Sequence, residues 1–207
     1  METNVKIQCR SPRIGDVAPD FHARSTAGDF QLSKLRGRWV VFFSHPADFT
    51  PVCSTEFAEL ARRQSEFDSL ETSLVGLSVD SLYSHFAWIR AIQATLGAEV
   101  RFPVIEDPTM AIGRAYGMVD ETSADSMAMR STFFIDPEGI IRAITCYPHN
   151  VGRSVDEMLR LVSALKTVAT IENLAPEGWR AGAPLLQPPC EMPDDCPDWF
   201  CRFVDAA

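Results

Sequence analysis

The chain has 207 residues, of which 46% are hydrophobic and 23% are charged, and its formal net charge is −9. This is the composition of an ordinary globular protein of one large domain, with or without an appendage, and it excludes a largely disordered chain. No apolar run approaches the ~20 residues that span a bilayer, and the negative charge would repel both nucleic acid phosphates and anionic membranes. Neither nucleic acid nor membrane is therefore expected as a partner.

The N-terminal segment and the cysteines bear on the compartment. Residues 1–16 lack the continuous apolar region of a secretory signal and the Arg- and Ser-rich helix of a transit peptide, so we expect a cytoplasmic protein. Six cysteines are scattered along the chain, at positions 9, 53, 146, 190, 196 and 201. A chain of this length needs no disulfide framework to fold, which makes thiol chemistry the better expectation.

A strand, a turn and a helix are predicted in succession around residue 50. Residues 40–44 are a β-rich run, a turn runs from Pro46 to Pro51, and a helical period follows at Cys53, Phe57, Leu60, Ala61, Gln64 and Phe67. Residues 73–79 predict a second strand. The helix is long enough for a right-handed crossover, so we expect a parallel βαβ unit.

Two further helices and an antiparallel hairpin are predicted downstream. One helix follows a cap at Asp80 or Ser81, and its apolar face is predicted to be Leu82, Phe86, Ile89, Gln93 and Leu96. Residues 101–105 predict a strand, and 132–135 and 140–146 flank a Pro- and Gly-containing turn that is typical of a hairpin. Ser154 and Glu157 form a capping box that begins the last helix. The order βαβ and then ββα indicates an α/β, thioredoxin-like fold, with a central mixed β-sheet flanked by helices.

The composition changes after residue 171. Residues 172–207 contain six prolines, and their seven acidic residues against two arginines supply −5 of the −9 net charge. So many prolines are incompatible with a packed helix. We therefore predict a domain over residues 1–171 and an extended C-terminal arm over 172–207, which lies on its own domain or on a neighbour.

Cys53 is placed where a thiol can react. It falls in the first turn of the predicted helix, where free N–H groups and the helix dipole favour the thiolate. It also shares the inner helix face with Phe57 and Leu60, and burial alone would favour the neutral thiol, so a cation or further donors should be present. Thr50, three residues earlier, can place a hydroxyl beside the sulfur.

These residues carry a family resemblance. Pro46, Thr50 and Cys53 fit the pattern P-x-x-x-T-x-x-C, which resembles the active-site signature of peroxiredoxins, and HPADFTPVCSTEF is similar to the one-cysteine subfamily. Matches at Arg130 and over residues 15–21 and 147–157 extend the resemblance over nearly the whole chain. The resemblance implies a thioredoxin-like peroxidase domain of the AhpC/TSA type, in which Cys53 attacks a peroxide oxygen and becomes a sulfenic acid.

The resemblance also implies roles for neighbouring side chains. Arg130 would favour the thiolate and stabilise charge on the breaking O–O bond, while the Thr50 hydroxyl and the Cys53 N–H would hold the peroxide. Pro46 would shield the sulfenic acid from further oxidation, and Glu56 would hold Arg130 in place.

Two more residues are assigned to the substrate site by resemblance. His45 would lie beside the sulfur, and Arg153 would be a second cation near the pocket. Less specific interpretations stay open: Cys53 as a core thiol, His45 as an ordinary buried histidine, and Arg153 as an ion-pair partner of Glu157. Trp88 and Phe49 are expected to be packing residues or to line the mouth of the site. Cys9 and Cys146 are expected to be inert, Cys146 because its strand should belong to the core.

Three cysteines lie in the arm. Cys190, Cys196 and Cys201 form no C-x-x-C pair, and the arm has no histidine, so zinc is not favoured. The segment 198–201, Asp-Trp-Phe-Cys, resembles the tail of archaeal-type members of the subfamily, in which a tail cysteine resolves the sulfenic acid of the partner subunit. By this resemblance Cys201 is the resolving cysteine and Cys196 an auxiliary thiol. The alternative is a true one-cysteine enzyme that an external thiol reduces directly.

The resemblance as a whole implies a peroxidase without metal or organic cofactor. Its substrates would be hydrogen peroxide and alkyl hydroperoxides, its reductant a thioredoxin-like protein or another thiol, and its assembly a homodimer that can extend to a decameric ring. A peroxide sensor or chaperone-like assembly switched by Cys53 oxidation is the alternative function. Lipid hydrolysis is disfavoured because residues 32–37 do not form a G-x-S-x-G elbow.

Overall fold

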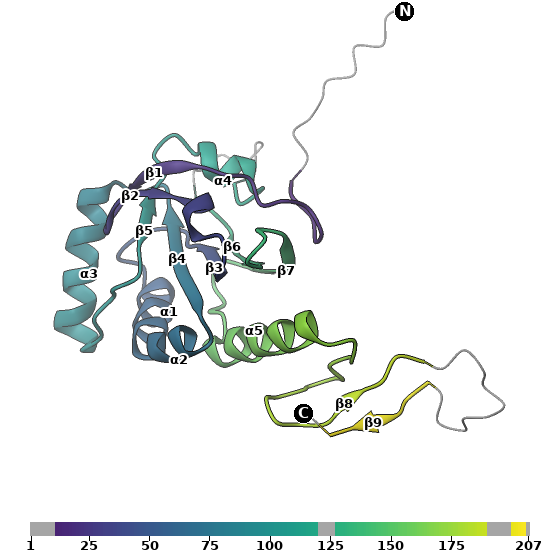
Figure 1. Ribbon diagram of the computed structural model, residues 1–207. Helices are drawn as coiled ribbons and strands as arrows, with labels where there is room; N and C mark the ends of the chain where they lie inside the picture. The colour runs from purple at the N-terminus through teal and green to yellow at the C-terminus, as the bar shows by residue number, and fades with distance from the viewer. Residues whose placement is uncertain (1–10, 120–126, 190–199, 206–207) are drawn as a thin grey trace, which may run out of the picture. The chain divides into compact units, whose positions relative to one another are not determined.

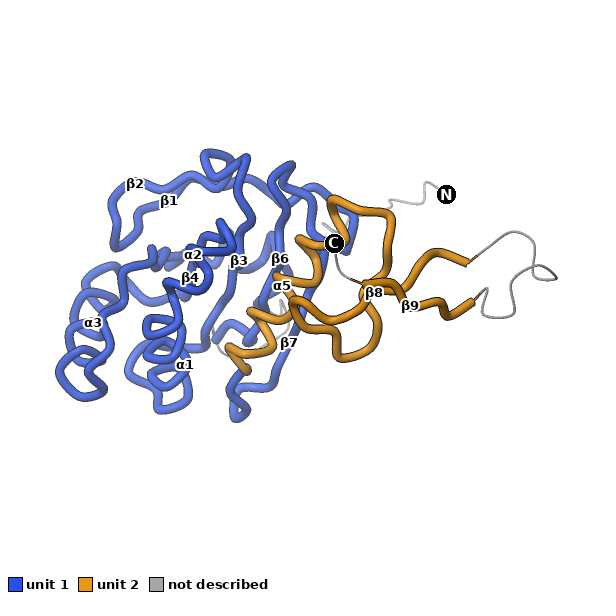
Figure 2. The backbone as a smooth tube through the Cα atoms, turned by 60° about the horizontal axis from the view of Figure 1, so that its bottom comes forward, with its two compact units in different colours: residues 1–153 blue, residues 154–207 orange. Residues whose placement is uncertain are grey.

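The computed structural model describes residues 11–119, 127–189 and 200–205. The chain divides into two units, residues 1–153 and 154–207, which Figure 2 colours blue and orange. In the residues that the structure describes, no helix has both the length and the apolar character needed to cross a bilayer.

The first unit is built on a mixed sheet of seven strands in the order β2-β1-β5-β4-β3-β6-β7 (Figure 1). The strands are β1 (His22–Ser25), β2 (Gly28–Gln31), β3 (Trp39–Ser44), β4 (Thr72–Ser78), β5 (Val104–Glu106), β6 (Arg130–Ile135) and β7 (Ile141–Tyr147). Strands β3, β4 and β5 run parallel to one another, while β1, β2, β6 and β7 pair antiparallel to their neighbours. The α/β class with a mixed central sheet is thus confirmed.

The predicted βαβ unit is present, and its helix is divided in two. Helix α1 (Pro51–Arg62) and the short α2 (Gln64–Ser69) connect β3 to β4, and all six residues of β3 are buried. A strand in the middle of a sheet is covered on both faces, which is why residues 40–43 are continuously apolar instead of alternating. The division falls at Arg63, whose φ and ψ of −97° and 6° lie outside the helical region.

Helix α3 (Leu82–Leu96) begins where the sequence predicted and buries a different face. The Ser81 hydroxyl accepts a hydrogen bond from the Ser84 N–H, which confirms the cap. The buried residues are His85, Trp88 and Ile92, whereas Phe86 is 40% exposed, so the predicted apolar face is wrong. Apolarity alone selects the wrong face because the polar atoms of His85 and Trp88 find hydrogen-bond partners in the interior.

The predicted hairpin is confirmed, and one of its cysteines is not where the sequence placed it. Strands β6 and β7 pair antiparallel across the turn at residues 136–139, where Gly139 adopts a φ of 80°. Cys146 is exposed, so the expectation of a core cysteine is wrong. The reason is the strand order: β7 lies at the edge of the sheet, and of its seven residues only Ile141 is buried.

Four elements of the first unit were not predicted. Strands β1 and β2 form a hairpin of only four residues each, η1 is a 3₁₀ helix (Leu32–Leu35), and α4 (Ala111–Ala115) is barely more than one turn. Segments this short carry too few apolar positions for a period to be recognised. They cover a core in which the rings of Phe42 and Tyr116 lie 4.8 Å apart and those of Tyr116 and Phe133 5.0 Å apart.

The second unit combines helix α5 (Val155–Thr170) with the C-terminal arm. Ser154 caps the helix by accepting from the Glu157 N–H at 3.2 Å, which confirms this half of the predicted capping box, whereas the Glu157 carboxylate pairs with Arg160. The arm contains the two-stranded sheet of β8 (Leu185–Leu186) and β9 (Phe203–Val204). Ala164 of the helix packs with Trp179 and Leu185 of the arm. The change in composition near residue 171 thus coincides with the end of α5. The contacts nevertheless group α5 and the arm in one unit.

Candidate active site

Cys53 lies in the first turn of α1 and is fully buried. Thr50 is the N-cap of the helix, Pro51 its first residue and Cys53 its third. The sulfur-bearing residue has 0% relative exposure. N–H groups in a first helical turn have no acceptor within the helix, so the partial positive charge of the helix N-terminus surrounds the thiol.

Arg130 supplies the cation that a buried thiolate requires. It is the first residue of β6 and is 2% exposed. Its Nη1 donates to Cys53 Sγ at 3.2 Å and to Glu56 Oε2 at 2.8 Å. Its Nε and Nη2 both donate to the carbonyl oxygen of His149, at 3.0 and 2.8 Å. The guanidinium is therefore held from three sides with one nitrogen directed at the sulfur.

Glu56 connects the two arginines that the sequence had placed near the site. One helical turn after Cys53, it accepts hydrogen bonds from Arg153 Nε at 3.0 Å, Arg153 Nη2 at 2.9 Å and the Arg153 N–H at 2.7 Å, in addition to the bond from Arg130. Burial acts to raise the pKa of Glu56, and the bonds and charge of Arg153 and then the charge of Arg130 outweigh it, so the pKa lies below its ordinary value. The carboxylate is charged.

The alternative interpretation of Arg153 is wrong. Glu157 pairs with Arg160 at 2.6 Å, while Arg153 is 6% exposed and pairs with Glu56. Its remaining nitrogen donates to the Ser131 carbonyl oxygen at 3.0 Å. Arg153 thus belongs to the same buried cluster as Cys53.

The loop between β3 and α1 carries the other signature residues. Pro46 is buried and Thr50 is half-buried. The Thr50 hydroxyl donates to the Ala47 carbonyl oxygen at 2.9 Å, which leaves its oxygen free to accept. Phe49 adopts a φ of 58° in the left-handed region, where a residue with a side chain is uncommon. Its ring is 57% exposed.

His45 is buried and hydrogen-bonds to Asp48. Its Nε2 lies 2.9 Å from Asp48 Oδ1, and its ring stacks on Trp88 at 4.9 Å. Burial is the largest influence on its pKa and lowers it, so the ring is neutral near pH 7. Its Nδ1 has no hydrogen-bond partner among the residues that the structure describes. The sequence placed His45 beside Cys53, and the contacts seen are with Asp48 and the aromatic rings.

Asp48 and His85 are structural features of the site that the sequence did not reveal. The second oxygen of Asp48 lies 2.8 Å from His85 Nδ1, and His85 Nε2 lies 3.2 Å from the Ile105 carbonyl oxygen. Burial acts to raise the pKa of Asp48, but the hydrogen bonds from His45 and His85 outweigh it, so the pKa lies well below its ordinary range. Only the i,i+3 spacing of His45 and Asp48 was available as a signal, because His85 lies far away in the sequence, on α3.

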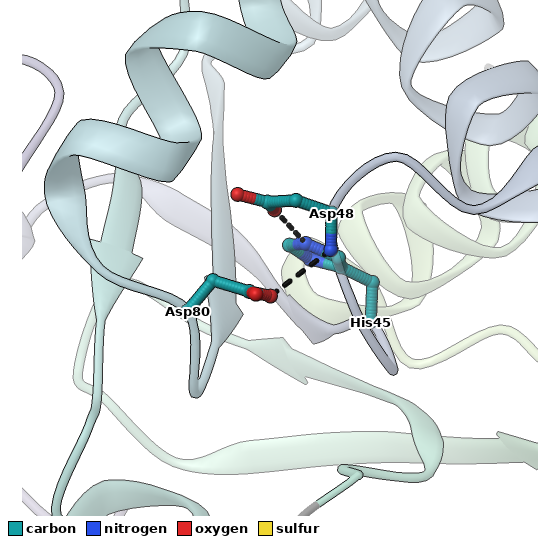
Figure 3. Close-up of side chains that lie close together, drawn as sticks. All are labelled: His45, Asp48 and Asp80. Atoms are coloured by element: carbon teal, nitrogen blue, oxygen red, sulfur yellow. Dashed lines mark hydrogen bonds and ion pairs between the residues drawn. The ribbon is translucent and has the colours of Figure 1, made fainter.

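His45, Asp48 and Asp80 form a cluster of metal-ligating residue types, with donor atoms all within 4.8 Å (Figure 3). Asp80 Oδ2 accepts from the Asp48 N–H at 3.0 Å and from the Ser78 hydroxyl at 2.8 Å. Both oxygens of Asp48 meet histidine nitrogens. Hydrogen bonds therefore explain this arrangement, which fastens the loop before α1 to the end of β4.

The arm cysteines are described only in part. Cys201 is an exposed free thiol of the second unit, just before β9. Cys9, Cys190 and Cys196 lie outside the described residues.

Comparisons with known proteins agree with this geometry. The family model described as "AhpC/TSA family" matches residues 14–144. The "Peroxiredoxin 2" of Caldanaerobacter subterraneus subsp. tengcongensis is 47% identical over 93% of this chain and 92% of its own length. The "Peroxiredoxin" of Methanosarcina mazei is 44% identical over 86% of this chain and 84% of its own.

Solved structures lead to the same family. The yeast mitochondrial 1-Cys peroxiredoxin superposes with a TM-score of 0.85 at 34% identity, covering 94% of this chain and all of that one. A cysteine-to-serine mutant of the peroxiredoxin 6 of Arenicola marina gives a TM-score of 0.82 at 29% identity, covering 92% and 90%. With a buried thiol in a helical first turn, an arginine on its sulfur and relatives along almost its whole length, the chain belongs to the AhpC/TSA family and is a peroxiredoxin, a thiol-dependent peroxidase.

Proposed function

We propose that the chain reduces hydrogen peroxide and alkyl hydroperoxides through Cys53. The observation that carries this is the contact between Arg130 Nη1 and Cys53 Sγ at 3.2 Å in a fully buried site. The thiolate attacks one peroxide oxygen, the O–O bond breaks, and the departing oxygen takes a proton to leave as water or an alcohol. Sulfur is oxidised to the sulfenic acid, and the peroxide is reduced by two electrons.

The charges around the sulfur support this role. Arg130 and Arg153 carry two positive charges and Glu56 one negative charge, and all three side chains are at most 4% exposed. The group has an excess of one positive charge when Cys53 is a thiol and is neutral when Cys53 is a thiolate. Buried charges are tolerated when they are compensated, so the cluster favours the anion.

Thr50, Pro46 and the Cys53 N–H complete the proposed catalytic residues. The free lone pairs of the Thr50 hydroxyl and the unpaired N–H of the helical first turn are suited to hold the two peroxide oxygens in line with the sulfur. Pro46 would exclude water from the sulfenic acid. His45 and Arg153 act in this proposal as supports of the pocket wall.

For the second half of the cycle we propose that Cys201 of the partner subunit resolves the sulfenic acid. The thiol attacks the sulfenic sulfur, water leaves, and an intersubunit disulfide forms, which a thioredoxin-like protein or another dithiol then reduces. Cys201 is exposed and free, which suits this role. The cycle requires a homodimer, and the decameric ring and the cytoplasmic location expected from the sequence are part of the same proposal.

The test is to add one equivalent of hydrogen peroxide to the fully reduced protein and to map its peptides by mass under non-reducing conditions. We expect Cys53 joined to Cys201. Cys53→Ser should consume no peroxide, whereas Cys146→Ser, which also removes an exposed thiol, should behave like the wild type. Peroxide turnover by Cys53→Ser would overturn the proposal. A single oxidation of Cys53 without turnover in the presence of a dithiol would favour the peroxide sensor.

A further inference from the structure

A chain of hydrogen bonds connects helix α3 to the first turn of α1. Trp88 Nε1 donates to the Ser54 hydroxyl at 3.0 Å, and that hydroxyl donates to the Thr50 carbonyl oxygen at 2.8 Å. The same carbonyl oxygen also accepts from the Ser54 N–H at 3.0 Å. Ser54, which directly follows Cys53, therefore connects Thr50, the cap of α1, to Trp88 of α3.

This chain adds to the one bond by which Ser54 already holds the cap, the bond from its N–H to the Thr50 carbonyl oxygen. Pro51 has no N–H, and the N–H groups of the first turn have no acceptor inside the helix. Both oxygens of Thr50 take part in hydrogen bonds, the carbonyl oxygen with Ser54 and the hydroxyl with Ala47. A displacement of the Thr50 backbone would also move its side chain.

Trp88 is a rigid anchor for the chain. It is 1% exposed, and its ring lies 4.9 Å from that of His45 and 4.5 Å from that of Phe57. One turn earlier on the same helix, His85 holds Asp48 at 2.8 Å, so α3 fastens the loop before α1 as well. The donor to Ser54 therefore comes from a side chain that packing holds in one place.

We propose that Ser54, held by Trp88, is a positioning residue that aligns Thr50 for the peroxide. This rests on the proposed function, since it assigns Thr50 the task of holding a peroxide oxygen. The chain of bonds does not include Cys53 Sγ, Arg130 or Glu56. Its loss should therefore impair the alignment of the peroxide and leave the formation of the thiolate unchanged.

The test compares two reactions of Cys53 in the full-length protein. Hydrogen peroxide needs Thr50 for alignment, whereas iodoacetamide alkylates the thiolate without it. For Ser54→Ala we expect oxidation of Cys53 to slow by about tenfold, since small misplacements of reacting groups cost this much or more. Alkylation, followed across pH on the Cys53 peptide by mass spectrometry, should keep the wild-type rate and midpoint.

Two variants and a matched control complete the experiment. Ser54→Thr keeps the hydroxyl and should restore the wild-type oxidation rate. Trp88→Phe keeps a ring but removes the N–H, and oxidation should slow while alkylation does not. Thr55→Ala is the control: its hydroxyl donates to the Val52 carbonyl oxygen at 2.8 Å and is exposed, so both reactions should match the wild type.

The outcomes separate this proposal from the one on which it rests. Wild-type oxidation rates in Ser54→Ala and Trp88→Phe would overturn the positioning role while the peroxidase stands. Equal slowing of oxidation and alkylation would also overturn it, because that result reports a general disturbance of the helix. If Cys53 of the wild-type protein is not oxidised at all, the proposed function itself fails.

Discussion

Cys53 lies in a buried cluster with Glu56, Arg130 and Arg153, and each member depends on the others. Removing one partner of a buried ion pair leaves a charge without compensation, which costs far more than the pair contributes when intact. Arg130 differs from Arg153 because only Arg130 donates to the sulfur, at 3.2 Å. A substitution of Arg130 therefore tests the reaction of Cys53, and a substitution of Glu56 tests the stability of the cluster.

Arg130→Met should slow the oxidation of Cys53 by at least about 100-fold, because it removes the cation that would stabilise charge in the transition state. The measurement is the second-order rate of loss of the Cys53 thiol in hydrogen peroxide. Arg142→Met is the control, since Arg142 pairs with Asp136 and its side chain is 49% exposed. A rate within twofold of the wild type for Arg130→Met would contradict the assigned role.

Glu56→Gln should lower the free energy of unfolding at pH 7 by about 3–5 kcal/mol, because two buried guanidinium groups lose their counter-charge. Urea denaturation measures this. The exposed pair of Glu99 and Arg101 offers a control, since Glu99→Gln should cause no measurable change.

The same substitution carries a pH dependence. The pKa of Glu56 in the folded protein lies below its ordinary value of 4.5. Its stabilising contribution is therefore complete above the unfolded pKa and is lost as the pH falls through the lower folded pKa. We expect the stability gap between wild type and Glu56→Gln to narrow below about pH 4.5. A gap that stays constant down to pH 3 would show that the charge of Glu56 is not responsible.

At the scale of elements, α3 illustrates how tertiary contacts select a helix face. The apolar count favours the side with Phe86, yet the side with His85, Trp88 and Ile92 is buried. Two of these three side chains carry polar atoms, and Asp48 and Ser54 satisfy them. His85 on this buried face contacts Asp48 in the loop before α1, and Trp88 contacts Ser54 in the first turn of α1, so the helix supports the site.

The two faces of α3 can be compared directly. Ile92→Ala should lower the free energy of unfolding by about 2–5 kcal/mol, the range for large-to-small changes in a core, because Ile92 is 2% exposed. Phe86→Ala removes a larger side chain that is 40% exposed and should cost less. Thermal and urea denaturation of the two variants measure this. A larger loss of stability in Phe86→Ala than in Ile92→Ala would instead support the face predicted from the sequence.

At the scale of the whole molecule, the two units carry different parts of the proposed cycle. The first unit contains Cys53 and the buried cluster of Glu56, Arg130 and Arg153. The second contains α5, the arm and Cys201. Oxidation and recycling should therefore be separable by mutation.

Cys201→Ser should leave the first oxidation of Cys53 unchanged and abolish the covalent dimer that follows it. A non-reducing gel after one equivalent of peroxide measures the dimer, and the rate of thiol loss measures the first step. Turnover with a thioredoxin-like reductant should fall, because the sulfenic acid loses its resolving thiol. A dimer that persists in Cys201→Ser would assign resolution to another cysteine.

Several features of this molecule follow from short stretches of sequence. The strand, turn and helix around Cys53, the caps at Ser81 and Ser154, and the β6–β7 hairpin were all predicted, because each depends on residues close together in the chain. The reactive position of Cys53 is of the same kind, since a helical first turn is defined by the residues immediately before it. Arg130 and Arg153 were found only through the family resemblance.

The tertiary structure alone decided the long-range contacts and which faces of the helices and strands are buried. Arg153 meets Glu56 across 97 residues of sequence, and His85 meets Asp48 across 37. The exposure of Cys146 follows from the place of β7 at the edge of the sheet. A local pattern records backbone preference and apolarity, whereas the burial of a charged or polar side chain depends on partners that only the folded chain brings within hydrogen-bonding distance.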